Sequence, residues 1–198
     1  MTLDDALLRV TRLGIDSSPF IYFIESHPQH DKLVTEIFQG IAAGRCTGIT
    51  SVITLGEVLV QPLIRGDTRL QTEYRDVLLH SENLETFPID SVAAEAAAGL
   101  RARYRIRMPD ALQIAIALGA GCEAFLTNDT AVRRVTELRV LILAELESWA
   151  ASTVFLSPRQ WTDTGATLSG FQASSGQPST AIISSMERRG RGFRSCAG

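Results

Sequence analysis

Short apolar runs alternate with stretches of helical periodicity from residue 10 to about residue 148, and this alternation restricts the fold more than any other feature. Between residues 30 and 43, for example, apolar side chains fall at positions 33, 34, 37, 38 and 41, which is the spacing of one helix face. Strands separated by helices are typical of a parallel sheet, so the predicted fold class is α/β with helices on both faces of the sheet. We expect strands at 10–15, 46–49, 84–89, 123–126 and 139–143, and helices at 17–26, 30–43, 68–80, 91–104 and 109–118, with a further helix around residue 57.

The composition changes after Trp149, and we therefore expect two regions, a domain at 1–150 and a tail at 151–198. The tail contains 9 Ser and 6 Gly, shows no strong periodicity beyond AIISSM and includes the basic run RRGRGFR. Such a composition is typical of a flexible or loosely ordered segment. The net charge of the whole chain is −3, which does not indicate a general nucleic-acid-binding surface.

Neither a membrane span nor a secretory signal is expected. The first ten residues, MTLDDALLRV, are acidic, and no apolar run reaches the roughly 18 residues that a transmembrane helix needs. The three cysteines, Cys46, Cys122 and Cys196, are an odd number without a CxxC pair, which is typical of reduced thiols. The sequence therefore favours a cytoplasmic protein.

Four acidic residues fall where predicted strands turn into helices, or within the helices behind such turns: Asp16, Glu57, Asp110 and Asp129. Asp16 and Asp129 follow predicted strands directly, at the sheet edge where parallel α/β proteins bind ligands. Carboxylates close together repel each other, and a divalent cation such as Mg²⁺ or Mn²⁺ removes that conflict by taking oxygen ligands. A cation held there could activate a water for hydrolysis of a phosphodiester.

Each of these residues also has a purely structural interpretation. The three aspartates could be helix caps or first-turn acids, and Glu57 could be an exposed helical residue. The basic run Arg101, Arg103, Arg105 and Arg107 precedes Asp110. Its side chains could bind phosphates beside the acidic set, or could complement the dipole at a helix C-terminus. The residue pattern leaves both interpretations open.

Four segments together resemble the PIN-domain ribonucleases, especially the toxins of VapBC-type toxin–antitoxin pairs: IDSSPFIYFIE, ITSVITLGEVLV, MPDALQIAIAL and FLTNDTAV. The resemblance covers about residues 10–147. It implies a PIN-like three-layer α/β/α sandwich with a central, mainly parallel sheet of about five strands. It also implies a Mg²⁺- or Mn²⁺-dependent endoribonuclease, whose products would carry 5′-phosphate and 3′-hydroxyl ends.

The same resemblance assigns roles to individual residues. Asp16, Glu57, Asp110 and Asp129 would bind the metal and carry catalysis, and Thr127 would orient the last acid or a bound water. Ser17 would play a minor part beside the first acid, and we expect Arg105 and Arg107 to contact the substrate.

The resemblance further implies RNA as the substrate and a small antitoxin protein as a partner. A homodimer is also expected, because the helix at 53–64 has apolar residues on more than one side. A compact toxin of this family would end near the end of the predicted domain, so the tail is an addition. The rival hypothesis is a non-catalytic RNA- or protein-binding module on the same fold.

Overall fold

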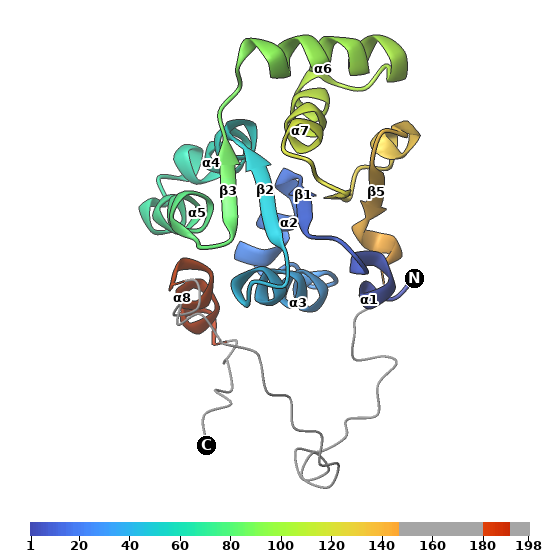
Figure 1. Ribbon diagram of the computed structural model, residues 1–198. Coiled ribbons are helices and arrows are strands. Elements are labelled where there is room, and N and C mark those ends of the chain that lie inside the picture. Colours follow the sequence, from blue (N-terminus) through green and yellow to red (C-terminus); the bar gives the residue numbers. More distant parts are fainter. Residues whose placement is uncertain (147–179, 191–198) are drawn as a thin grey trace, which may run out of the picture.

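The computed structural model describes residues 1–146 and 180–190 of the 198-residue chain. Its sheet has the strand order β3-β2-β1-β4-β5, and every neighbouring pair is parallel (Figure 1). The strands are β1 (Arg12–Ile15), β2 (Thr47–Ser51), β3 (Leu84–Phe87), β4 (Ala124–Thr127) and β5 (Arg139–Ile142). The predicted parallel α/β class is therefore confirmed, and each strand lies where the sequence placed one.

The central strand of the sheet is β1, and the order in which successive strands are added reverses there. From β1 the chain builds outward through β2 to β3, then crosses back so that β4 pairs with the free side of β1 and β5 lies beyond it. Sheets of this type bind ligands at the carboxyl edge, where the strand order reverses. In this protein that position lies between the ends of β1 and β4.

Helices cover both faces of the sheet. They are α1 (Leu3–Leu7), α2 (Ser17–Ile24), α3 (Asp31–Ala42), α4 (Val52–Arg65), α5 (Thr68–His80), α6 (Ser91–Tyr104), α7 (Met108–Gly119) and α8 (Thr180–Arg188), with short 3-10 helices η1 (Thr130–Arg134) and η2 (Leu143–Glu145). One apolar core contains Phe20, Phe38 and Tyr74 from α2, α3 and α5. The other contains Leu100 and Ile114 from α6 and α7. These two cores confirm the predicted three-layer α/β/α sandwich.

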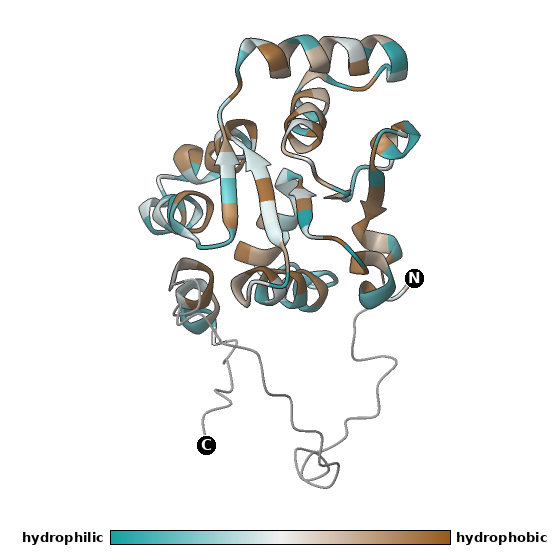
Figure 2. Cartoon of the chain, in the orientation of Figure 1, coloured by the Kyte–Doolittle hydropathy of each residue, from teal (hydrophilic) through white to brown (hydrophobic). Residues whose placement is uncertain are grey.

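The two edge strands of the sheet differ in hydropathy. Figure 2 shows β5 as largely hydrophobic, whereas β3, at the opposite edge, includes a hydrophilic stretch. Glu85 on β3 is exposed and pairs with Arg12 on β1, with 3.4 Å between Arg12 Nη2 and Glu85 Oε1. A charged side chain on an edge strand discourages pairing with another chain.

The C-terminal region differs in part from the expectation of a flexible tail. Residues 151–179 and 191–198 lie outside the described residues, so the expectation and the boundary at residue 150 stay predictions there. At residues 180–188, however, the chain forms α8, which packs against α3 and α5 and buries Ile182 and Met186 completely. This segment contains AIISSM, the one part of the tail with a visible period in the sequence, and it forms a helix against a surface that the rest of the fold provides.

Two further expectations concern membrane-spanning helices and the state of the cysteines. Within the described residues, no helix combines the length and the apolar character needed to cross a membrane. Cys46 and Cys122 are free, buried thiols, and burial raises the pKa of Cys122 to about 12. A thiol held neutral in this way is a packing residue and a poor nucleophile.

The tight packing of β1 yields a testable prediction. A Cβ atom added at Gly14 would lie 2.7 Å from Cδ2 of Phe125 and 2.8 Å from Cβ of Ala117. Because both neighbours belong to the core between the sheet and α7, we expect Gly14→Ala to lower the free energy of unfolding by about 1–3 kcal/mol. Urea denaturation of the variant measures this change.

Gly99→Ala is the matched control. Gly99 lies within α6, and nothing stands within 4 Å of an added Cβ there. Alanine is the better helix former, so this variant should be up to about 1 kcal/mol more stable than the wild type. A Gly14→Ala protein as stable as the wild type would contradict the close approach of β1 to β4 and α7.

Candidate active site

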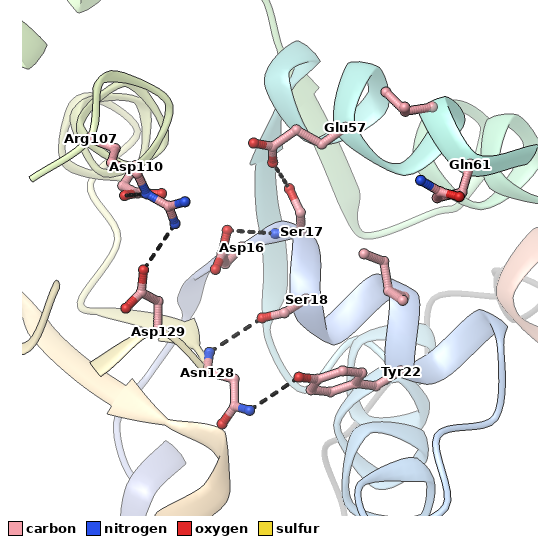
Figure 3. A pocket seen from close by; sticks show the side chains of 12 residues that line it. Asp16, Ser17, Ser18, Tyr22, Glu57, Gln61, Arg107, Asp110, Asn128 and Asp129 are labelled. Atoms are coloured by element: carbon pink, nitrogen blue, oxygen red, sulfur yellow. Dashed lines mark hydrogen bonds and ion pairs between the residues drawn. The ribbon is translucent and has the colours of Figure 1, made fainter. Parts of the chain in front are cut away.

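A polar cavity opens at the carboxyl edge of the sheet, at the point where the strand order reverses. Its volume is about 690 Å³, and its walls come from α2, α4, the start of α7 and the segment that follows β4. Figure 3 shows the side chains of Asp16, Glu57, Asp110 and Asp129 around a common space. Folding has therefore gathered the four acidic residues that the sequence singled out, all of which line the cavity.

Asp16 is the most enclosed of the four and is held by two hydrogen bonds. Its Oδ1 accepts from the backbone N–H of Ser17 at 2.7 Å, which makes Asp16 the N-cap of α2. Its Oδ2 accepts from Oγ1 of Thr127 at 2.6 Å. Burial raises the pKa of Asp16, the charges of Asp110 and Glu57 raise it further, and the two hydrogen bonds lower it in part.

Thr127 connects two of the acidic residues. Its side chain is completely buried at the end of β4, and its Oγ1 also accepts a hydrogen bond of 3.0 Å from the backbone N–H of Asp129. Asp129 in turn caps η1, because its Oδ1 accepts from the N–H of Ala131 at 2.8 Å. The hydroxyl of Thr127 therefore fixes the carboxylate of Asp16 and the backbone of Asp129 in one arrangement.

Arg107 bridges the other two aspartates across the mouth of the cavity. Its Nε donates to Oδ2 of Asp110 at 3.2 Å, and its Nη2 donates to Oδ2 of Asp129 at 3.1 Å. Asp110 lies in the first turn of α7, behind Pro109, which suits a position whose N–H would have no helical partner. The side chain of Arg107 is 76% exposed, so it is held by charge and can move away without disturbing the core.

Glu57 is held by a network that sequence reasoning missed. Its Oε2 accepts from Oγ of Ser17 and, at 3.2 Å, from Nε2 of Gln113 on α7. Gln113 is buried and also donates to Oγ of Ser17, at 3.2 Å. The signal was present in the sequence: Gln113 is a polar residue within an apolar helical run, three positions after Asp110 and so on the same helix face.

A second set that sequence reasoning missed lies on the α2 side of the cavity. The backbone N–H of Asn128 donates to Oγ of Ser18 at 3.3 Å, and its Nδ2 donates to the hydroxyl of Tyr22 at 3.1 Å. Its Oδ1 accepts from the N–H of Ala144 at 3.1 Å. Asn128 thus ties α2 to the segments that follow β4 and β5.

The basic run divides between the site and the surface. Arg107 lines the cavity, whereas Arg105 is exposed at the left-handed C-cap of α6, with φ of 54°, and is not among the lining residues. Arg103 forms an ion pair with Glu137, away from the cavity. The expected substrate contacts of Arg107 and Arg105 both stay predictions, and of the two only Arg107 lines the cavity.

The donor set fits a hard divalent cation in its chemistry, although the side chains do not form a closed cage. Among residues 1–146 and 180–190, no group of three or more His, Cys, Asp and Glu side chains stands close enough to hold a metal ion. Arg107 holds Asp110 and Asp129, while Ser17 and Gln113 hold Glu57. All available donors are oxygens, and Asp16 experiences the charges of its acidic neighbours, which a cation would neutralise. Binding would require Asp110 and Asp129 to exchange Arg107 for the metal.

The fold and the cavity define an α/β protein with an acidic site at its topological switch point. Residues 14–138 match the PIN domain family, and the chain belongs to that family. Similar solved structures include VapBC2 from Rickettsia felis bound to a DNA fragment from its promoter, with 19% identity over 70% of this chain and 98% of that chain and a TM-score of 0.53. A toxin–antitoxin complex from Klebsiella pneumoniae shows 21% identity over 67% of this chain and 97% of that chain, with a TM-score of 0.51. At 19% and 21% sequence identity, these similarities show a shared fold only. No curated protein sequence matches the chain.

The raised pKa of Asp16 predicts how stability changes with pH. In the folded protein the pKa lies above its ordinary value of 3.8, so the contribution of Asp16 to stability is fully present below that value and is lost as the pH rises through the folded pKa. Asp16→Asn removes the buried charge, and its amide can still accept from Ser17 and donate to Thr127. We therefore expect this variant to unfold at higher urea concentration than the wild type at neutral pH, with the difference vanishing in acid.

Asp129→Asn serves as the control for this experiment, because that carboxylate is also a cap but is 33% exposed. It should change stability little at any pH between about 4 and 8. If Asp16→Asn were less stable than the wild type at neutral pH, the charged carboxylate would be a net stabilising cap, and the assignment of a desolvated functional acid would fail.

Proposed function

We propose that this protein is a metal-dependent endoribonuclease and the toxin of a toxin–antitoxin pair. The observation that carries the proposal is the convergence of Asp16, Glu57, Asp110 and Asp129 on one cavity at the switch point between β1 and β4. Membership of the PIN domain family supports a nuclease. The toxin–antitoxin complexes among the similar folds support the biological role.

The acidic residues would hold Mg²⁺ or Mn²⁺ in the cavity. When bound, such an ion supplies a water of lowered pKa and neutralises charge on the attacked phosphate. Thr127 keeps Asp16 oriented by its 2.6 Å hydrogen bond, and Gln113 and Ser17 orient Glu57. Because water rather than a ribose hydroxyl attacks in this scheme, the products would carry 5′-phosphate and 3′-hydroxyl ends.

Arg107 would exchange its partners during the reaction. It neutralises Asp110 and Asp129 in the free protein, and a metal that takes over these carboxylates would release the guanidinium at the mouth of the cavity. A released arginine is well suited to a phosphate, because its planar fork of donors matches two phosphate oxygens. This movement would bring positive charge to the RNA backbone in an otherwise acidic site.

The same proposal extends to the binding partners and the cellular location of the protein. We propose a cognate antitoxin as the inhibitor and the cytoplasm as the location, which the free thiols of Cys46 and Cys122 support. We also propose a homodimer formed through α4, where Val60, Leu63 and Ile64 are 49%, 56% and 73% exposed. Val60 lines the cavity as well, so a partner on this helix would lie beside the site.

The first test is cleavage of a mixed RNA pool by the purified protein with Mg²⁺, Mn²⁺ or EDTA. We expect cutting with either metal, none with EDTA, and a loss of roughly a hundredfold or more in Asp110→Asn, because one metal ligand loses its charge. Asp110→Asn keeps the size of the side chain, and circular dichroism checks its fold.

One result would favour the rival hypothesis of a binding module. Asp16 and Asp129 are helix caps, and Asp110 is a first-turn acid, so each has a structural role that does not need catalysis. Folded protein that binds Mn²⁺ and RNA without cutting either the pool or defined single strands would refute the nuclease and leave a binding function.

The bridging position of Arg107 yields a separate prediction about metal affinity. Arg107→Ala removes the competitor for Asp110 and Asp129, so Mn²⁺ should bind several-fold more tightly, as measured by calorimetry. The same variant should bind RNA more weakly, with a shallower dependence on salt, because one phosphate contact is lost. Arg105→Ala is the matched control and should leave the metal affinity unchanged. Unchanged Mn²⁺ affinity in Arg107→Ala would show that the bridge does not compete with the metal.

A further inference from the structure

Helix α8 lies in a depression formed by elements that are far away in the sequence. It packs against α3 and α5 (Figure 1), and its Ile182 and Met186 are completely buried in the core that also contains Phe23 and Tyr74. The two apolar residues of α8 are four positions apart and so share one helix face. This is the way an amphipathic helix occupies a groove on another protein.

A polar anchor accompanies the apolar contacts. Glu73 on α5 is only 4% exposed, and its Oε1 accepts a hydrogen bond of 2.6 Å from Oγ of Ser185. Nε of Arg189 lies 3.9 Å from the same oxygen. A buried carboxylate requires such partners, and here α8 and the residue after it bring both a hydroxyl and a guanidinium.

Arg189 also binds the end of α2. Its guanidinium lies over the ring of Phe23, 4.1 Å from the centroid, and its Nη1 donates to the carbonyl oxygen of Phe23. Carbonyls in the last turn of a helix lack helical partners and carry the negative end of the dipole, so a cation is favourable there. Nη2 of Arg189, however, is buried without a hydrogen-bond partner. This contact stabilises the docked helix by less than a fully satisfied one would.

The family match does not include α8. It ends at residue 138, and the similar solved chains are covered over 97–98% of their own length while accounting for 67–70% of this chain. Helix α8 is therefore an addition to the part of the chain that defines the family. A helix of nine residues is also too short to be stable in water by itself, so its structure comes from the surface on which it lies.

We propose that α2, α3 and α5 form a docking groove for a short amphipathic helix, and that α8 is an internal ligand which occupies this groove reversibly. The recognition pattern consists of Ile182, Ser185, Met186 and Arg189, which follow one helix face at i, i+3, i+4 and i+7. Glu73 is the acceptor that selects the serine and the arginine. This proposal does not depend on the nuclease activity, since the groove and the acidic cavity use different side chains.

The experiment uses the full chain carrying Met186→Glu, which places a charge against the apolar groove and prevents its own α8 from docking. A fluorescent peptide of residues 180–190 is then added, and binding is followed by anisotropy. We expect saturable binding to this variant and much weaker binding to the wild type, whose own α8 competes for the groove. The peptide with Arg189→Ala should bind roughly thirtyfold more weakly or worse, because the guanidinium beside Oε1 of the buried Glu73 is lost and only Arg69, 3.8 Å from Oε2, remains as a charged partner. The peptide with Arg188→Ala, an exposed position, should bind like the parent.

Hydrogen exchange of the full chain provides the second measurement and covers the case in which Met186→Glu does not fold. In the wild type we expect the amides of α8 to exchange by a local opening, well before those of the sheet. In Arg189→Ala this opening should be more frequent by a similar factor, and in Arg188→Ala it should be unchanged.

Two outcomes would overturn the proposal. A folded Met186→Glu chain that takes up no peptide would show that the face is not a groove for this helix. Exchange of α8 only together with the sheet would make it an integral part of the core. If the peptide bound the wild type as tightly as the Met186→Glu variant, or if α8 protection depended on protein concentration, the internal ligand would be refuted.

Discussion

The candidate site depends above all on the pairing of β1 with both β2 and β4. Because β1 is central, the segments that leave its carboxyl end and that of β4 emerge side by side and diverge, which opens the cavity. The backbone N–H of Asp16 donates to the carbonyl of Leu126 at 2.9 Å, so the hydrogen bonding between β1 and β4 extends to the edge of the cavity. Gly14 permits the close approach of β1 to Phe125 and Ala117 on which this pairing rests.

The acidic residues serve local structure and the cavity at once. Asp16 and Asp129 cap the helical segments that follow their strands, and Asp110 opens α7. A cap must lie at the end of a strand or the start of a helix, and in a parallel sheet these are the places from which side chains reach the ligand-binding edge. The structural and functional interpretations of these residues are therefore compatible. The hydroxyl of Thr127 supplies a hydrogen bond that the enclosed carboxylate of Asp16 requires, and the amide of Gln113 orients the more exposed Glu57.

Much of the fold and part of the site were predictable from the sequence, for reasons that differ between residues. The strands and helices of residues 10–143 repeat apolar patterns of fixed period, and Pro109 marks a helix start, so their order and parallel arrangement could be predicted. Gln113 could be identified only by its place three positions after Asp110 within an apolar helical run, whereas Asn128, a single polar residue in a loop segment, has no periodic signal. Arg105 and Arg107 looked equivalent in the sequence, but the left-handed turn at Arg105 separates them, and only Arg107 reaches the cavity.

The helical structure of α8 depends on its tertiary contacts rather than on its local sequence. A stretch of nine residues with two buried apolar side chains does not fold from its own preferences, and only contact with α3 and α5, with Glu73 as acceptor, makes it a helix. The sequence by itself determined the alternation of strands and helices, the caps and the set of acidic residues, because these follow from periodicity and from chemistry along the chain. The tertiary structure alone decided which charges meet. Arg107 meets Asp129, and Arg189 lies against Glu73 and Phe23, because these contacts join residues far apart in the sequence that only the path of the folded chain brings together.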